Sequence, residues 1–145
     1  MNNPDRLAAI RIEIAGKNYE SALQMGRSEL ERGCGSSDLL LLMATAGQLS
    51  DGNSCSLDEV RGWLEQATTT SPESVEAWLE LGHFLDAVAD EPQLAASAFT
   101  RALEKSVAFL EATLDGLGST APSHDEAMQG RLSELRQYAL RLLSS

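Results

Sequence analysis

The chain has 145 residues, of which 43% are hydrophobic and 23% charged, and this is the composition of one globular domain rather than of a disordered segment. The longest uninterrupted apolar run, Leu39–Ala44, is far shorter than the ~20 residues that a membrane-spanning helix requires. The formal net charge of −11 repels nucleic-acid phosphates and anionic lipids, so we expect neither nucleic acid nor a membrane as partner.

The cysteine content and the first residues of the chain indicate in which cellular compartment the protein is expected. Only Cys34 and Cys55 are present, in a chain that is large enough to fold without disulfides. The first residues lack the basic start and apolar stretch of a secretory signal. We therefore expect two free thiols and a cytoplasmic location.

Apolar residues recur at three- and four-residue spacing almost throughout, which predicts helices. No stretch shows the strict alternation of a half-buried strand, so the fold class is predicted to be all-α. Polar caps, Pro and Gly mark the helix ends. The first three predicted helices are 4–15 after Asn3-Pro4, 19–32 between Asn18 and Gly33, and a third capped by Ser37.

The next helix has the clearest start signal. Ser56-Leu57-Asp58-Glu59 is a capping box, in which the Ser56 hydroxyl accepts from the Glu59 N–H and the Glu59 carboxylate accepts from the Ser56 N–H. Cys55 and Val60 flank it as a hydrophobic staple, and the helix is expected over 57–69. Further starts are predicted at Ser71-Pro72 and at Asp90-Glu91-Pro92.

The C-terminal part contains the clearest break. Gly116, Gly118 and Pro122 precede a second capping box, Ser123-His124-Asp125-Glu126. Residues 107–117 either prolong the sixth helix or form a separate one. The last helix is expected to have an apolar face made by Met128, Leu132, Leu135, Ala139 and Leu142.

Large and small residues recur with a period close to that of helical repeats. The clearest unit consists of Trp78, Leu81 and Gly82 on one helix, followed by Ala95, Phe99 and Ala102 on the next. Val60 precedes Ala95 by 35 residues and follows Ala22 by 38, which is near the ~34-residue period of tetratricopeptide repeats. We expect Gly82 and Ala95 to permit close approach within one hairpin.

These residues, together with GKNYESAL at 16–23, resemble the tetratricopeptide-repeat family. The resemblance implies one domain, 1–145, built as an all-α superhelix of antiparallel helix hairpins. Its repeats would span 4–36, 37–70 and 71–106, followed by C-terminal capping helices over 107–145. Trp78, Leu81 and Phe99 would then fill the seam between the last two hairpins.

No motif in the sequence indicates a catalytic, metal-binding or cofactor-binding site. His83, His124 and the two cysteines lack metal-ligand spacing, and no phosphate loop, nucleophile elbow or dinucleotide fingerprint occurs. We expect no cofactor, no metal and no enzymatic activity.

The expected function is protein binding. Residues 33–100 contain eleven acids and one base, Arg61. The resemblance implies that the first helix of each hairpin lines a concave groove, which would hold a basic or amphipathic segment of another protein. The groove positions are Asp38, Leu41, Leu42, Thr45, Gln48, Leu49, Glu76, Leu79, Glu80, His83 and Asp86.

Two alternatives to an adaptor remain open. Small acidic chaperones of secreted or assembling proteins are built from similar repeats and have a similar size. A self-associating structural module would instead pack an exposed Leu39–Leu42 and the last helix across a two-fold axis, giving a homodimer.

Overall fold

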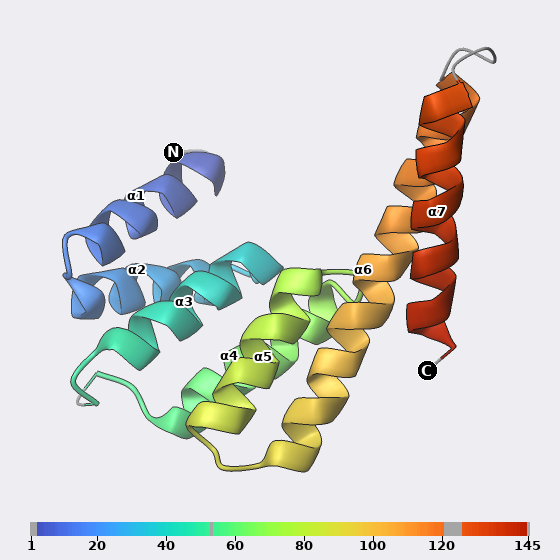
Figure 1. Cartoon of the computed structure of the whole chain (residues 1–145). Coiled ribbons are helices and arrows are strands. Elements are labelled where there is room, and N and C mark those ends of the chain that lie inside the picture. Colours follow the sequence, from blue (N-terminus) through green and yellow to red (C-terminus); the bar gives the residue numbers. More distant parts are fainter. Residues whose placement is uncertain (1–2, 53, 121–125, 145) are drawn as a thin grey trace.

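The computed structural model describes residues 3–52, 54–120 and 126–144, and these form helices with no strand (Figure 1). The protein is an all-α assembly in which helices that follow one another in the chain pack side by side. The helices are α1 (Asn3–Ala15), α2 (Tyr19–Glu31), α3 (Ser37–Leu49), α4 (Leu57–Thr70), α5 (Val75–Ala87), α6 (Pro92–Thr120) and α7 (Glu126–Leu143).

The first six helices form three hairpins, α1–α2, α3–α4 and α5–α6. The first helix of each hairpin has 13 residues. The second helices begin at Tyr19, Leu57 and Pro92, which are 38 and 35 residues apart. These are the spacings of the sequence pattern, so the predicted helical repeat is present at the level of the helices.

The start of α3 differs from the prediction by one residue. Ser36, and not Ser37, is the N-cap, and its hydroxyl accepts a hydrogen bond from the Leu39 N–H at 3.2 Å. Ser37 is buried, and its hydroxyl donates to the Ala67 carbonyl of α4 at 3.4 Å. Two adjacent serines offer equal capping chemistry, so only the packing of α3 on α4 decides between them.

The start of α5 also lies later than predicted. Ser71-Pro72 belongs to the preceding turn, and α5 begins after Ser74, whose hydroxyl accepts from the Ala77 N–H at 3.2 Å. The capping box at α4, in contrast, is confirmed with both of its hydrogen bonds, at 3.2 and 2.9 Å.

The main hydrophobic core runs through the three hairpins. Among its fully buried side chains are Ile10, Leu23, Met43 and Leu64, from α1 to α4. Leu39, Leu40 and Leu41 are buried in the same core, and Leu42 is half-buried. The expectation that Leu39–Leu42 forms an exposed self-association surface is therefore wrong, because α3 is enclosed by its neighbours on most of its circumference.

A glycine permits close packing inside the third hairpin. A Cβ atom at Gly82 would lie 2.7 Å from the Phe99 ring of α6, which is closer than a side-chain carbon tolerates. Gly47 has the same relation to Val60 in the second hairpin, at 2.8 Å. Gly82 is thus a close-approach position, as predicted. Phe99, which was expected in the seam between the hairpins, lies against Gly82 and does not line the cleft at Trp78.

The open question about residues 107–117 is resolved, because they prolong α6 into one helix of 29 residues. Its last turns extend past the N-terminus of α5 and pack against α7 (Figure 1). An ion pair between Arg136 and Asp115 joins these two helices. Val107, Leu114 and Leu132 are buried, outside the main core.

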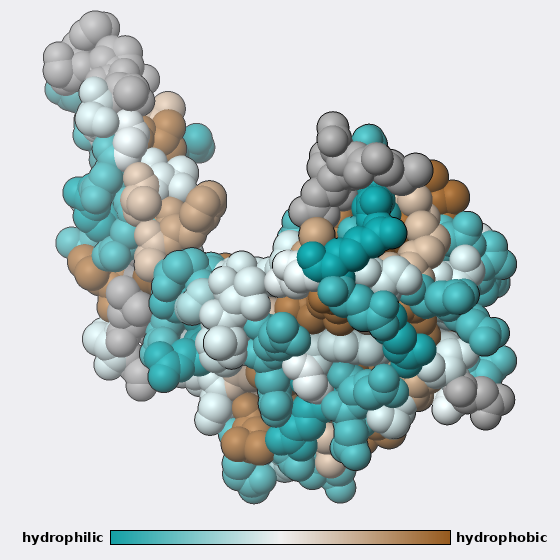
Figure 2. All heavy atoms as spheres, turned by 180° about the vertical axis from the view of Figure 1, so that it is seen from behind, coloured by the Kyte–Doolittle hydropathy of each residue, from teal (hydrophilic) through white to brown (hydrophobic). Residues whose placement is uncertain are grey.

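The C-terminal helices do not lie where the cap of the repeats was expected. In the described residues α7 contacts α6 alone. Figures 1 and 2 show the arm of α6 and α7 standing away from the hairpins instead of lying across their end. The predicted capping box at Ser123-His124 lies outside the described residues.

Candidate partner-binding face

The first helices of the three hairpins lie side by side. α1 contacts α3 and α3 contacts α5, although each pair is separated in sequence by a whole helix. Within the described ranges the backbones of the second helices α2, α4 and α6 do not approach one another as closely, and α2 meets α4 through side chains such as that of Arg27. A stack whose first helices approach more closely than its second helices curves toward the first helices, so α1, α3 and α5 line the inner side (Figure 1).

The predicted groove positions on α3 divide by burial. Leu41 is buried in the core and cannot meet a partner, so its assignment to the groove is wrong. The other five positions are exposed or half-buried, namely Asp38, Leu42, Thr45, Gln48 and Leu49.

The predicted positions on α5 remain accessible. Glu76, Leu79, His83 and Asp86 are exposed, and Glu80 is half-buried. The helices α3 and α5 begin 38 residues apart, so Asp38 and Glu76 occupy equivalent places. Glu76 and Glu80 are one turn apart and therefore share a side of the helix.

The inner side of α3 and α5 is acidic without compensation. Neither helix contains Lys or Arg. Among the described residues their four carboxylates, Asp38, Glu76, Glu80 and Asp86, take part in no ion pair. α1 contributes the exposed Arg11, which restricts the acidic stretch to the second and third hairpins.

Several acids of the second helices and of the α5–α6 turn, in contrast, are paired, although Asp58 of α4 is not paired among the described residues. Glu59 at the start of α4 accepts from Arg27 of α2 at 3.1 Å. Arg61 of α4 donates to Glu65 at 2.8 Å and to Glu91 at 3.0 Å, and this second pair connects the second and third hairpins. The bases of the central region are thus used on the outer helices, and the uncompensated negative charge lies on the inner ones.

The seam between the second and third hairpins holds Trp78. Its indole N–H donates to the Pro72 carbonyl at 2.8 Å. The half-buried ring lines a cleft of about 220 Å³ together with Leu81, Leu94 and Ala98 of the same hairpin and Arg61 of α4. Ala95 and Ala102 are buried along α6.

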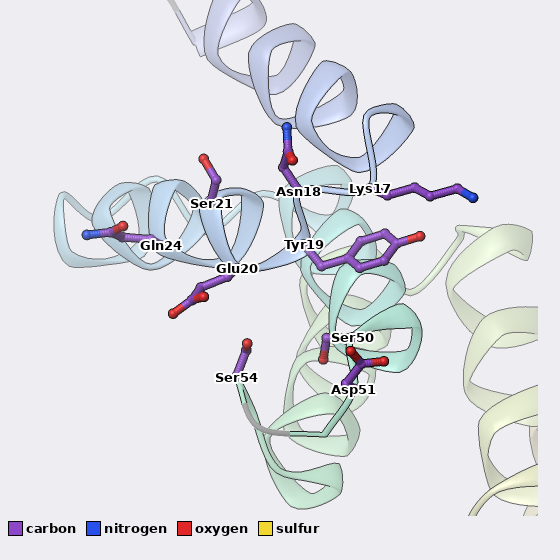
Figure 3. Close-up of a pocket in the computed structure, with 9 residues that line it drawn as sticks. All are labelled: Lys17, Asn18, Tyr19, Glu20, Ser21, Gln24, Ser50, Asp51 and Ser54. Atoms are coloured by element: carbon purple, nitrogen blue, oxygen red, sulfur yellow. The ribbon is translucent and has the colours of Figure 1, made fainter.

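A polar cleft of about 650 Å³, which the sequence did not indicate, lies between the α1–α2 turn and the α3–α4 loop (Figure 3). Most of its residues come from turns and helix ends, where periodic patterns give no signal. The labelled side chains do not converge on one point: Lys17 and Tyr19 extend to one side, and Gln24 extends to another. The arrangement does not form a centre for chemistry.

The nucleophilic and metal-binding residue types are dispersed. Cys34 and Cys55 are free thiols, and burial, followed by the Glu59 carboxylate, raises the pKa of the Cys55 thiol. His83 meets the Phe99 ring edge-on, with the ring centres 5.2 Å apart. No cluster of three or more possible metal ligands occurs among the residues of the described ranges.

No helix in the described part of the chain has the length and apolarity needed to cross a membrane. Comparisons with protein-family models, with curated proteins and with solved structures found no match.

Proposed function

We propose that the protein is a non-enzymatic adaptor of the tetratricopeptide-repeat type, which holds a basic, amphipathic segment of another protein against α3 and α5. The assignment to this family is supported by three successive hairpins, by 13-residue first helices, and by the Trp78, Leu81 and Gly82 pattern followed by Phe99. Helical repeats of this kind act through the side chains of an extended inner face.

The observation that supports this function most directly is the separation of charge between the two sets of helices. Among the described residues the carboxylates of α3 and α5 form no ion pair, whereas Glu59, Glu65 and Glu91 of α4 and of the α5–α6 turn are each paired with an arginine. Unpaired surface carboxylates attract a cationic partner and raise its association rate. Leu42 and Leu49, on the same side of α3, supply the apolar contact that an amphipathic segment requires.

Fluorescence anisotropy with a labelled amphipathic peptide of Leu and Lys tests this proposal, with the Leu and Glu version of the peptide as a negative control. We expect only the Lys peptide to bind, with an affinity at least about tenfold lower at ~500 mM than at ~50 mM salt. Glu76→Lys combined with Glu80→Lys should weaken binding by about tenfold or more.

The matched control is Asp51→Lys combined with Asp58→Lys. This variant changes the net charge equally, at two exposed acids outside α3 and α5 that form no ion pair among the described residues. Binding should be largely kept. Equal loss in both variants would show that only the overall charge attracts the peptide, and the adaptor proposal would then fail.

A further inference from the structure

The third hairpin ends in an apolar face that no helix covers. Leu41 of α3 and Leu79 of α5 occupy equivalent positions, 38 residues apart, but Leu41 is 7% exposed and Leu79 is 38% exposed. The same holds for the second helices, where Thr68 of α4 is 6% exposed and its counterpart Leu103 of α6 is 46% exposed. The third hairpin packs against the second, and in the described ranges no further hairpin packs against the third.

This face, which we call the open end, consists of Val75, Leu79, Phe99 and Leu103. Val75 and Leu79 are one turn apart on α5, as Phe99 and Leu103 are on α6, so each pair shares a side of its helix. The Phe99 ring lies over Gly82 and against His83, which places it at the border between the two helices. A repeat array normally closes such an end with a polar cap.

The chain's own α7 does not close the open end. It lies along the last turns of α6, beyond the N-terminus of α5, and contacts α6 alone among the described residues (Figure 1).

The outward side of α7 has the complementary chemistry. Arg131, Leu135, Tyr138 and Arg141 follow one another at three- and four-residue spacing and, together with Glu134, line one shallow groove along α7. Leu135 is 47% and Tyr138 57% exposed. Neither Arg131 nor Arg141 forms an ion pair among the described residues. We call these four residues the α7 stripe.

Charge distinguishes the two surfaces. α5 carries three unpaired carboxylates and no base, and Asp86 stands two turns after Leu79 on the same side of the helix. The α7 stripe places an arginine at each end of an apolar pair. An amphipathic helix with basic flanks fits an apolar face with acidic flanks both in hydrophobic area and in sign of charge.

We propose that a second copy of this chain covers the open end with its α7 stripe, so that two chains form a reciprocal dimer. Each copy donates its α7 and receives the partner's, which gives a closed two-fold assembly in which no open end remains exposed. The proposal goes beyond the adaptor function. On α5 the open end meets the inner face at Leu79 and Asp86, whereas Glu76 and Glu80 lie on the inner face alone. The proposal predicts that Glu76 and Glu80 stay free for a partner in the dimer.

Sedimentation equilibrium of the full chain over about 1 to 200 µM tests the proposal. We expect the mass of a dimer at the upper concentrations. Leu79→Glu combined with Leu103→Glu, and separately Leu135→Glu combined with Tyr138→Glu, should each give the 15.6 kDa monomer with unchanged helical circular dichroism. Leu49→Glu, an equally exposed leucine on α3, is the matched control and should remain dimeric.

A charge exchange keeps the test decisive if the glutamate variants fold poorly. The single variants Asp86→Arg and Arg141→Asp should each weaken the dimer by about tenfold. The double variant, which carries both substitutions in one chain, should restore it. A chain that is monomeric at every concentration, including one whose own α7 covers the open end, would overturn the proposal. A dimer that survives both glutamate variants would also overturn it. Retention of Lys-peptide binding by the monomeric variant Leu135→Glu combined with Tyr138→Glu, whose substitutions lie on α7 and outside the inner face, separates this outcome from failure of the adaptor function.

Discussion

Leu41 and Leu79 are the same residue type in the same place on two equivalent helices, and their environments differ. Leu41 is buried in the main core, whereas Leu79 on the last hairpin is exposed. α3 and α5 both have 13 residues and both start after a serine cap. The difference therefore comes from the neighbour and not from the helix itself.

This comparison shows that a leucine at the same position of a repeat can have two different structural roles. A leucine at this position seals the interface wherever another hairpin follows, and it becomes exposed apolar surface where the series ends. The same leucine position thus stabilises the packing in the middle of the molecule and leaves exposed apolar surface at its end.

The largest expected effect separates the two leucines directly. Leu41→Ala should lower the free energy of unfolding by about 2 to 5 kcal/mol, because it leaves a cavity in the core. Leu79→Ala should lower it by less than about 1 kcal/mol, measured by urea denaturation at low protein concentration, where the monomer prevails. Similar losses for both variants would mean that Leu79 is covered in the monomer.

The next effect concerns the close approach of α5 and α6. Gly82→Ala should destabilise by about 1 to 3 kcal/mol, since the new methyl group would overlap the Phe99 ring. Gly62→Ala on α4 is the matched control, because nothing lies within 4 Å of its added Cβ. That variant should stabilise the protein by about 0.5 to 1 kcal/mol. Thermal unfolding that ranks the two variants in the reverse order would contradict the packing described for this hairpin.

A smaller effect should be equal in the two hairpins. Ser36→Ala and Ser74→Ala each remove an N-cap hydrogen bond of 3.2 Å, to Leu39 and to Ala77 respectively. Each should cost about 1 kcal/mol, because capping is local and does not depend on whether another hairpin follows. Chemical denaturation of the two variants checks this, and a difference above about 1 kcal/mol would show that the caps are coupled to the packing beyond them.

The smallest effect is electrostatic and lies at the seam between the first two hairpins. The hydrogen bond from the Ser56 N–H lowers the pKa of Glu59, and Arg27 lowers it further. A carboxyl whose pKa is depressed by folding stabilises the protein above its unfolded pKa of about 4.5, and this contribution is lost as the pH falls through the lower folded value. Glu59→Gln should therefore reduce stability slightly near pH 7 and flatten its dependence on pH below 4.5. An unchanged pH profile would contradict this pairing.

The sequence predicted most of the local structure, because helix ends depend on nearby residues. The expected helices 4–15, 19–32 and 57–69 agree with α1, α2 and α4 within a residue at each end. The Ser56–Glu59 capping box formed as predicted, since its donors and acceptors are all within one turn.

The predictions that failed depended on tertiary packing. The choice between Ser36 and Ser37, the burial of Leu41 and the position of Phe99 against Gly82 are each decided by a second helix. The path of α7 along the end of α6 depends on whether α6 continues past α5. Periodicity in one helix does not contain this information.

The candidate site was predicted in part, because charge can be read from a sequence while pairing cannot. The acids of α3 and α5 were identified from composition and spacing. Pairing depends on contacts between residues up to 32 positions apart in the sequence. Such contacts pair Glu59, Glu65 and Glu91 with arginines and leave the acids of α3 and α5 unpaired in the described part of the chain. The open end had no signal in the sequence, since Leu79 and Leu103 fit a covered position equally well.

Cysteine accessibility tests most directly whether packing stops at the third hairpin. In a chain with Cys34→Ser and Cys55→Ala, single cysteines are introduced as Leu41→Cys or Leu79→Cys and treated with a maleimide reagent under native conditions. We predict slow labelling at position 41 at every protein concentration. At position 79 we predict fast labelling in dilute solution and protection as the concentration rises. Equal rates at the two positions, or protection of position 79 in dilute solution, would contradict the account.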